Sequence, residues 1–206
     1  RREYTGQPPR LCRQAADELA EPLGPHLDRL AADLASGFDA VGLSVSFSQI
    51  FASLALARRL KARAPGVRVV LGGAQVTGEA GPALLAEYPF LDFVIQGEGE
   101  RPLVALLDAL AGAGGDPDGI RGVLSRANAS RHPAGASQWP VERADDLPTP
   151  DYDAYFARRA EVRHVVALPL EGARGCWWDR THRTGDPRDR CYFCTSNLHM
   201  PGYRPK

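Results

Sequence analysis

The stretch DAVGLSVSFSQIFASLALARRLKARAPGVRVVLGG, residues 39–73, decides the fold. Its two ends, 39–47 and 67–73, are short apolar runs rich in Val and Leu, which is typical of strands buried on both faces. Between them apolar residues recur at helical spacing, and those on one helical face are Ile50, Leu54, Ala57 and Leu60. A strand, a helix and a second strand in this order predict a βαβ unit with parallel strands.

The same alternation of helices and strands continues on both sides of this unit. The further helices that we expect are 11–37, interrupted by the prolines at 22 and 25, then 79–87 and 100–112. A third strand is expected at 90–97, and 120–126 is a candidate for a fourth. The pattern predicts an α/β fold with a Rossmann-like, doubly wound parallel sheet.

A change of composition after the last of these strands indicates a second domain. Residues 127–150 are polar and contain Pro, Gly, Ser and Asn, as an interdomain linker does. A short helix is expected next, and the apolar run 162–170 predicts a new strand. The predicted divisions are a first domain 1–126, a linker 127–160 and the start of a second domain 161–206. We expect an N-terminal fragment, because a complete β/α barrel needs roughly 200 residues or more.

Composition and charge exclude several classes of protein. Lys plus Arg and Asp plus Glu number 25 each in 206 residues, so the chain lacks the basic surplus of a nucleic-acid binder. No apolar run approaches the roughly 20 residues that a membrane helix needs. Of the four cysteines one is isolated, Cys12, and three are clustered, which favours a metal or redox role in a reducing cytoplasm over a secreted disulfide framework. We expect a cytoplasmic protein with no nucleic-acid or membrane partner.

The three strand ends of the first domain carry small polar residues and glycines. In an open parallel sheet, ligands bind beyond the carboxyl ends of the strands, where glycine lets the backbone approach them closely. The candidate binding residues are Ser44, Ser46, Gln49, Gly72, Gly73, Gln96, Gly97, Glu98 and Gly99. Two alternatives stay open: the glycines serve ordinary turns, and Ser46 caps the following helix. No GxGxxG follows any strand, so a dinucleotide is not favoured.

The cysteine cluster reads C-x14-C-x2-C and consists of Cys176, Cys191 and Cys194. Three thiolates on a four-iron cluster leave one iron without a protein ligand, and an open coordination position is what chemistry requires. Zinc is an alternative, with His182 or His199 as the fourth ligand, and unligated buried thiols are another. The polar stretch 179–190 between the first two cysteines is expected to bulge into solvent as a loop. Trp177 and Trp178 are expected in a core, and the alternative is that they exclude water from a cluster or stack on a cofactor.

The first domain resembles the cobalamin-binding domain that precedes radical SAM enzymes. The likeness lies in VGLSVSFSQIFASLALARRLK, VVLGGAQVTGE and FLDFVIQGEGERPL. It implies that the nucleotide tail of cobalamin passes the serine-bearing strand end and the GG turn, so that the nine strand-end residues named above contact cobalamin. The Asp-x-His-x-x-Gly motif, whose His ligates cobalt in many cobalamin proteins, is not in this sequence. The family's first strand, which precedes the initial helix, is also expected to be missing.

The cysteine region resembles the cluster loop of radical SAM enzymes that mature ribosomally made peptides. The matching residues are Glu171, Arg174, Gly175, Cys176, Trp177, Trp178, Cys191, Phe193, Cys194, Tyr203, Arg204 and Lys206. The gap of 14 residues departs from the general C-x3-C-x2-C pattern. The resemblance implies a partial TIM barrel in which the three cysteines hold a 4Fe–4S cluster that binds S-adenosylmethionine, with Phe193 packed on its adenine.

The same resemblance implies an activity. One electron cleaves S-adenosylmethionine, the resulting 5′-deoxyadenosyl radical removes a hydrogen atom from carbon, and methylcobalamin delivers a methyl group. The implied partners are a precursor peptide as substrate and an electron donor such as ferredoxin or flavodoxin. Two alternatives stay open: a radical SAM enzyme that does not methylate, and a non-catalytic module that binds cobalamin or zinc.

Overall fold

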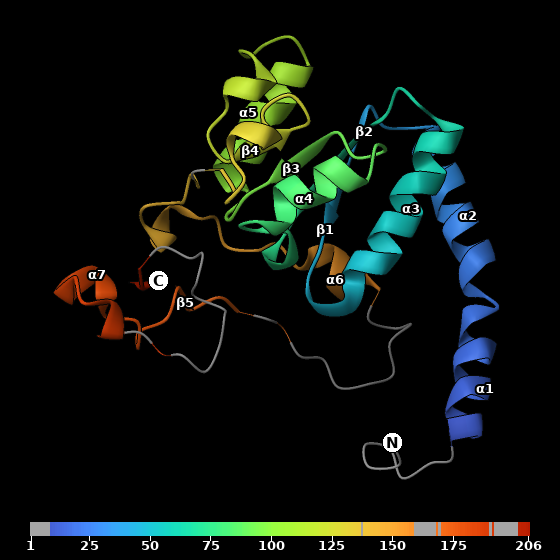
Figure 1. Ribbon diagram of the computed structural model, residues 1–206, viewed down its shortest axis with the longest axis horizontal. Helices are drawn as coiled ribbons and strands as arrows, with labels where there is room; N and C mark the ends of the chain where they lie inside the picture. Colours follow the sequence, from blue (N-terminus) through green and yellow to red (C-terminus); the bar gives the residue numbers. More distant parts are fainter. Residues whose placement is uncertain (1–8, 137, 159–167, 169, 190, 192–201) are drawn as a thin grey trace. The chain divides into compact units, whose positions relative to one another are not determined.

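The computed structural model describes residues 9–136, 138–158, 168, 170–189, 191 and 202–206. The chain divides into two compact units, residues 1–137 and 138–206. The first unit contains a four-stranded sheet with helices, and the second contains short elements around a two-stranded ladder (Figure 1). None of the described helices combines the length and the apolar character needed to cross a membrane.

The sheet of the first unit confirms the predicted α/β fold and corrects one strand direction. Its strands are β1 (Ala40–Ser44), β2 (Arg68–Gly72), β3 (Phe93–Ile95) and β4 (Val123–Ser125), in that spatial order. The first three are parallel, but β4 runs antiparallel to β3, so the prediction of an all-parallel sheet was wrong there. The reason is the connection: the chain from 111 to 122 returns to the carboxyl end of β3 before β4 begins, and Val123 pairs with Ile95.

Helices cover both faces of the sheet, as the doubly wound pattern predicts. The helices of this unit are α1 (Pro9–Ala20), α2 (Leu23–Ala35), α3 (Ile50–Arg63), α4 (Ala80–Glu87) and α5 (Glu100–Leu110). On one face α3 and α4 bury Leu60 and Leu85 against Leu71 of β2, and on the other α5 buries Leu106 against Val70 and Phe93. Figure 1 shows α2 lying alongside α3.

Strand β1 differs from its neighbours because, within the part of the chain that the structure describes, only one of its faces is packed against a core. Val41 is buried among the side chains under α3, whereas Gly42 and Ser44, which point to the other face, are exposed. The strands β2, β3 and β4 are buried on both faces over most of their length. The apolar run at 39–47 therefore forms the strand that we expected, but as an edge strand with one open face.

The segment after β4 continues to pack on the first unit. Ala129 is buried in the same core as Leu85, and Ala136 lies against it. Short 3-10 turns complete the described chain: Phe47–Gln49, Ala74–Val76, Pro117–Gly119, Ala129–Arg131, Ala144–Asp146 and Pro187–Asp189.

The second unit contains α6 (Asp153–Ala157), β5 (Ala173–Arg174), α7 (Thr181–Thr184) and β6 (Arg204–Pro205). Strands β5 and β6 pair antiparallel, with Ala173 opposite Pro205 and Arg174 opposite Arg204. The expected short helix near 152–160 is confirmed as α6. The predicted strand 162–170 lies outside the described residues except for Leu168 and Leu170.

Candidate cofactor sites

The carboxyl ends of β1 and β2 join through a glycine that no other residue could replace without strain. The Val45 N–H donates to the Gly72 carbonyl at 2.7 Å, and the Gln75 N–H donates to the Val45 carbonyl at 3.3 Å. Gly73 has φ 99° and ψ 176°, a region that is essentially restricted to glycine. A Cβ atom there would lie 2.5 Å from the Val45 oxygen. Gly73 therefore lets two backbones touch, and we call Gly72 and Gly73 together the glycine cradle.

The serines and Gln49 follow the end of β1. Ser44 is exposed, and none of the described residues hydrogen-bonds to its hydroxyl. Ser46 and Gln49 form a capping box, in which the Ser46 N–H donates to the Gln49 Oε1 at 3.0 Å. This is the capping role considered for Ser46, and it fixes the turn between β1 and α3. Contact of these residues with a ligand stays a prediction.

Gln96, at the end of β3, has an internal role. Its side chain is buried, and its Oε1 accepts from the Gly78 N–H at 2.8 Å while its Nε2 donates to the Val76 carbonyl at 2.5 Å. Gln96 thus holds the loop that follows the glycine cradle. The other predicted binding residues after β3 are Gly97, Glu98 and Gly99. Glu98 is also buried, and Gly97 has a positive φ of 77°. A Cβ atom at Gly99 would meet no atom within 4 Å.

The variant Gln96→Leu is expected to lower the free energy of unfolding by about 2.5 kcal/mol, because the Gly78 N–H and the Val76 carbonyl lose their buried partner. Urea unfolding followed by circular dichroism measures this change. The matched control is Gln75→Leu, which alters an exposed glutamine in the same loop and is expected to stay within about 0.5 kcal/mol of the unaltered chain. Equal stabilities of the two variants would contradict the internal role of Gln96.

One residue at the carboxyl edge of the sheet, Phe47, was not among the binding residues predicted from the sequence. It lies directly after Ser46 with φ 48°, and it is the one residue other than glycine with a positive φ among those described. Its side chain is 87% exposed. Nothing in the composition of SVSFSQ distinguishes this Phe from one that ends a buried strand.

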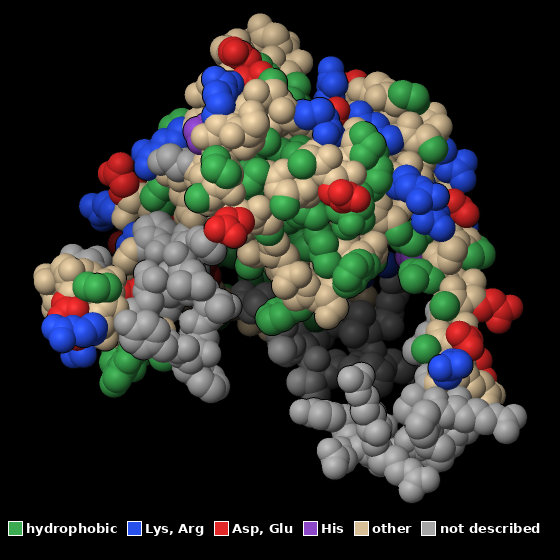
Figure 2. Space-filling model, in the orientation of Figure 1, with side chains coloured by type: hydrophobic (Ala, Val, Ile, Leu, Met, Phe, Trp, Pro, Cys, Tyr) green, Lys and Arg blue, Asp and Glu red, His purple; other side chains and the backbone are tan. Residues whose placement is uncertain are grey.

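A cavity of about 820 Å³ lies elsewhere on the first unit, beside α4. It is bounded by α4 through Pro82 and Ala83, and by the segment after β4 through Arg126 and Pro133. Figure 2 shows hydrophobic side chains gathered over α4 on this face. None of the predicted binding residues lines this cavity, so it is distinct from the carboxyl edge of the sheet.

In the second unit the ladder of β5 and β6 brings together the two sides of the cysteine region. The Lys206 N–H donates to the Gly172 carbonyl at 2.9 Å and extends the pairing of Arg174 with Arg204. Arg174 also binds the Glu171 carboxylate in two places, at 2.8 and 3.0 Å. Gly175, with φ 76°, turns the chain out of β5 directly before Cys176. The segment that contains all three cysteines is therefore closed at its base.

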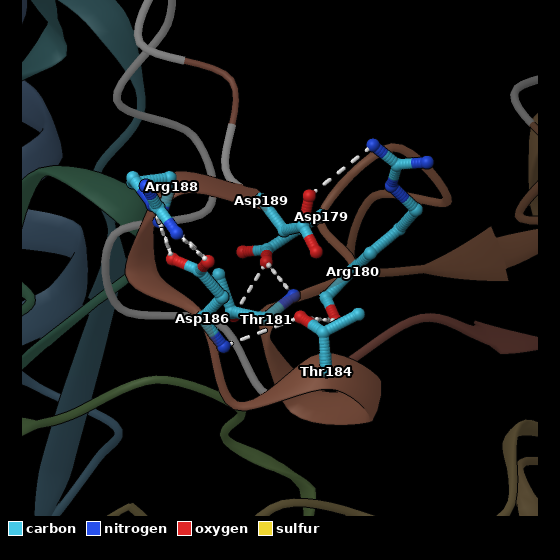
Figure 3. A network of polar contacts seen from close by, with 7 residues as sticks. All are labelled: Asp179, Arg180, Thr181, Thr184, Asp186, Arg188 and Asp189. Carbon is cyan, nitrogen blue, oxygen red and sulfur yellow. Dashed lines mark hydrogen bonds and ion pairs between the residues drawn. The ribbon is translucent and has the colours of Figure 1, made fainter.

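The polar insertion between Cys176 and Cys191 is a structured turn rather than a plain loop (Figure 3). Asp179 is buried and accepts from the N–H and the hydroxyl of Thr181, at 3.1 and 2.6 Å, at the start of α7. Gly185 ends α7 in the left-handed conformation. Farther along, hydrogen bonds from Arg188 hold the pKa of Asp186 below its ordinary value.

Backbone contacts close the insertion near both cysteines. The Arg180 N–H donates to the Asp189 carbonyl at 3.1 Å, and their side chains form an ion pair at 3.4 Å. The Asp179 N–H donates to the Cys176 carbonyl at 3.1 Å. Residue 180 thus lies beside residue 189, so the chain leaves this turn close to where it entered.

The thiols are described for two of the three predicted ligands. Cys176 and Cys191 are partly buried, whereas Cys194, Phe193 and His199 lie outside the described residues. Within the described part of the chain, no three His, Cys, Asp or Glu side chains are grouped so as to hold a metal ion. The three-cysteine site stays a prediction.

The expectation that the two tryptophans lie in a core was wrong. Trp177 is 66% exposed and Trp178 is 51% exposed, and their rings contact edge to face with centroids 5.1 Å apart. The Arg180 guanidinium lies 5.9 Å from the Trp178 ring centroid, as in a cation–π contact. The pair packs on itself and on the insertion instead of into a core.

Two comparisons with known proteins bear on these sites. Residues 20–107, which include β1, β2, β3 and the glycine cradle, match the B12 binding domain family. The chain is also 29% identical over 161 residues to an uncharacterized methyltransferase of Pyrococcus horikoshii. That alignment covers 78% of this chain and 32% of the relative, so the chain spans about a third of the relative's length. The first unit is thus similar to domains that bind B12, and the edge that carries the cradle lies inside the matched region.

Proposed function

We propose that this chain belongs to a cobalamin-dependent radical SAM enzyme that methylates a carbon atom of a ribosomally made precursor peptide. Support for the cobalamin part comes from the B12 binding domain match over residues 20–107 and from the geometry of the strand ends. Support for the methyl transfer comes from the relative, which is named a methyltransferase. The observation that carries the radical SAM part is the group of three cysteines, Cys176, Cys191 and Cys194, in a segment whose base is closed by the pairing of β5 with β6.

The first unit has the features that a nucleotide tail of cobalamin needs. At the glycine cradle, the absence of a Cβ on Gly73 lets the Val45 backbone close on the end of β2, which fixes the two strand ends where a ligand of the sheet binds. Ser44 offers an exposed hydroxyl beside it. Gln96 and the capping box hold the surrounding turns in place before a ligand arrives. These residues fit cobalamin, with Ser44 and the cradle as the binding groups and Gln96 as a positioning residue.

The donor set of the second unit fits an iron–sulfur cluster. Thiolates are the usual ligands of such clusters, and three of them leave one iron open to S-adenosylmethionine. Cys176, Cys191 and Cys194 would hold the cluster, and the hydrogen bonds of residues 179–189 would keep the first two at the ends of a closed turn. When bound, these cofactors supply radical hydrogen abstraction and a transferable methyl group, while the protein positions them and excludes water. A ferredoxin or a flavodoxin would supply the electron.

Activity is tested on the complete reading frame that contains this chain. The protein is loaded without oxygen with iron, sulfide and hydroxocobalamin, and is given S-adenosylmethionine, reductant and the precursor peptides encoded beside it. We expect 5′-deoxyadenosine and a peptide heavier by one CH2 unit, both absent from the Cys176→Ala variant. Formation of 5′-deoxyadenosine without a methylated peptide would replace this proposal with non-methylating radical chemistry. A colourless protein with stoichiometric zinc would overturn it.

A further inference from the structure

Phe47 combines two features that rarely occur together. Its backbone is in the left-handed region at φ 48°, which is unfavourable for a bulky side chain. Its ring is nevertheless 87% exposed, so burial of the ring in the described structure does not compensate for the strain. Strain of this kind persists only where the surroundings impose it, and it concentrates at ligand sites.

The surroundings of Phe47 impose this conformation from both sides. Before it, Val45 is fixed to β2 by the hydrogen bond to Gly72, and after it Gln49 reaches back to the Ser46 N–H. The Gln49 N–H also donates to the Ser46 carbonyl at 3.1 Å and closes the turn around Phe47. The chain therefore holds the Phe47 ring outward instead of folding it into the core.

A second exposed phenylalanine lies four residues farther along the chain. Phe51, in the first turn of α3, is 78% exposed. Neither ring belongs to either hydrophobic core of the described residues. We call Phe47 and Phe51 the phenylalanine pair. It begins three residues after Ser44, at the carboxyl end of β1, where an open parallel sheet binds its ligands.

We propose that the phenylalanine pair packs against the corrin macrocycle of cobalamin, while the glycine cradle receives the nucleotide tail. This inference rests on the cobalamin part of the proposed function. The two sites differ in chemistry: the cradle offers backbone groups and the Ser44 hydroxyl, which suit a polar tail, whereas the pair offers two aromatic rings, which suit the face of a large flat macrocycle. Both lie within the residues that match the B12 binding domain.

Two corrinoids separate the two contacts. Hydroxocobalamin carries the nucleotide tail, and dicyanocobinamide has the same macrocycle without it. In the full-length protein, Phe47→Ala and Phe51→Ala are each expected to weaken the binding of both corrinoids by about tenfold, since each removes a ring buried by the macrocycle. Ser44→Ala is expected to weaken the binding of hydroxocobalamin and to leave that of dicyanocobinamide unchanged. Dissociation constants from calorimetry measure both effects.

The matched control is Phe38→Ala. Phe38 is also exposed, at 58%, but it precedes β1 and lies at the opposite end of that strand. Its removal is expected to leave the affinity for both corrinoids unchanged. A second variant, Phe47→Gly, is expected to weaken the binding of both corrinoids while raising the urea midpoint, because glycine adopts φ 48° without strain. That combination excludes unfolding as the cause of the weaker binding.

The outcomes distinguish this inference from the proposal on which it rests. Suppose that the unaltered protein binds hydroxocobalamin, and that Phe47→Ala and Phe51→Ala bind each corrinoid with the same affinity as the unaltered protein. The inference then fails and the cobalamin site stands. An equal loss in Phe38→Ala also overturns the inference. If the unaltered protein binds neither corrinoid, the cobalamin part of the proposed function fails, and the role of the pair fails with it.

Discussion

A Cys176→Ala variant of the full-length protein, purified and reconstituted without oxygen, is expected to retain almost none of the iron that the unaltered protein binds. We expect about four iron atoms per chain in the unaltered protein, because the cluster that we propose for the three thiolates contains four irons. Removal of one thiolate leaves two, too few to hold the cluster, and Cys191→Ala is expected to have the same effect. Colorimetric iron and sulfide analysis and the visible absorbance of the cluster measure the loss.

The chain provides its own control for this experiment. Cys12 lies in α1, in the other unit, and Cys12→Ala is expected to keep the full iron content. Retention of iron by Cys176→Ala would contradict the cluster assignment. Stoichiometric zinc that is lost in both Cys176→Ala and His199→Ala would favour the zinc alternative in place of the cluster.

Gly73→Ala is expected to be the most destabilising single methyl addition at the sheet edge, lowering the free energy of unfolding by about 4 kcal/mol. The added Cβ would lie 2.5 Å from the Val45 oxygen and 2.8 Å from the Val45 nitrogen. Relief requires moving the ends of β1 and β2 apart, and the backbone also has to leave a region essentially restricted to glycine. The affinity for hydroxocobalamin is expected to fall with it, because the displaced backbone forms the cradle.

Urea unfolding measures this loss of stability, with Gly66→Ala as the control. Gly66 lies before β2, its φ is not positive, and an added Cβ would meet no atom within 4 Å. Its replacement is expected to change the free energy of unfolding by less than about 1 kcal/mol. If Gly73→Ala were as stable as Gly66→Ala, the strand ends would not depend on this close approach.

The sequence predicted the helices and the first three strands of the first unit because their signals are local. Leu54, Ala57 and Leu60 recur at helical spacing, and all three are buried on α3, as expected. The antiparallel direction of β4 could not be predicted from local patterns, since it depends on the path of the chain from 111 to 122. The pairing of β5 with β6 was also missed, because each strand has only two residues and leaves no periodic signal.

The sequence predicted where the candidate site lies, but it predicted less well what the individual residues of the site do. The Gly72–Gly73 pair after a buried strand indicated a close approach, and the structure places that approach at Val45. The hydrogen bonds of the buried Gln96 side chain could not be predicted from the sequence, because its partners, Val76 and Gly78, come from another loop. Phe47 was missed for a related reason: the turn that fixes its backbone depends on the side chain of Gln49.

The short-range closure of the turn between Arg180 and Asp189 has a consequence for how this region tolerates changes in length. Arg180 is hydrogen-bonded and ion-paired to Asp189, so these two residues are held side by side. The number of residues between them therefore does not determine the positions of residues 180 and 189. Doubling a flexible loop adds only about 0.6 kcal/mol of closure entropy. Insertions within 182–187 are therefore expected to leave Cys176 and Cys191 in their places.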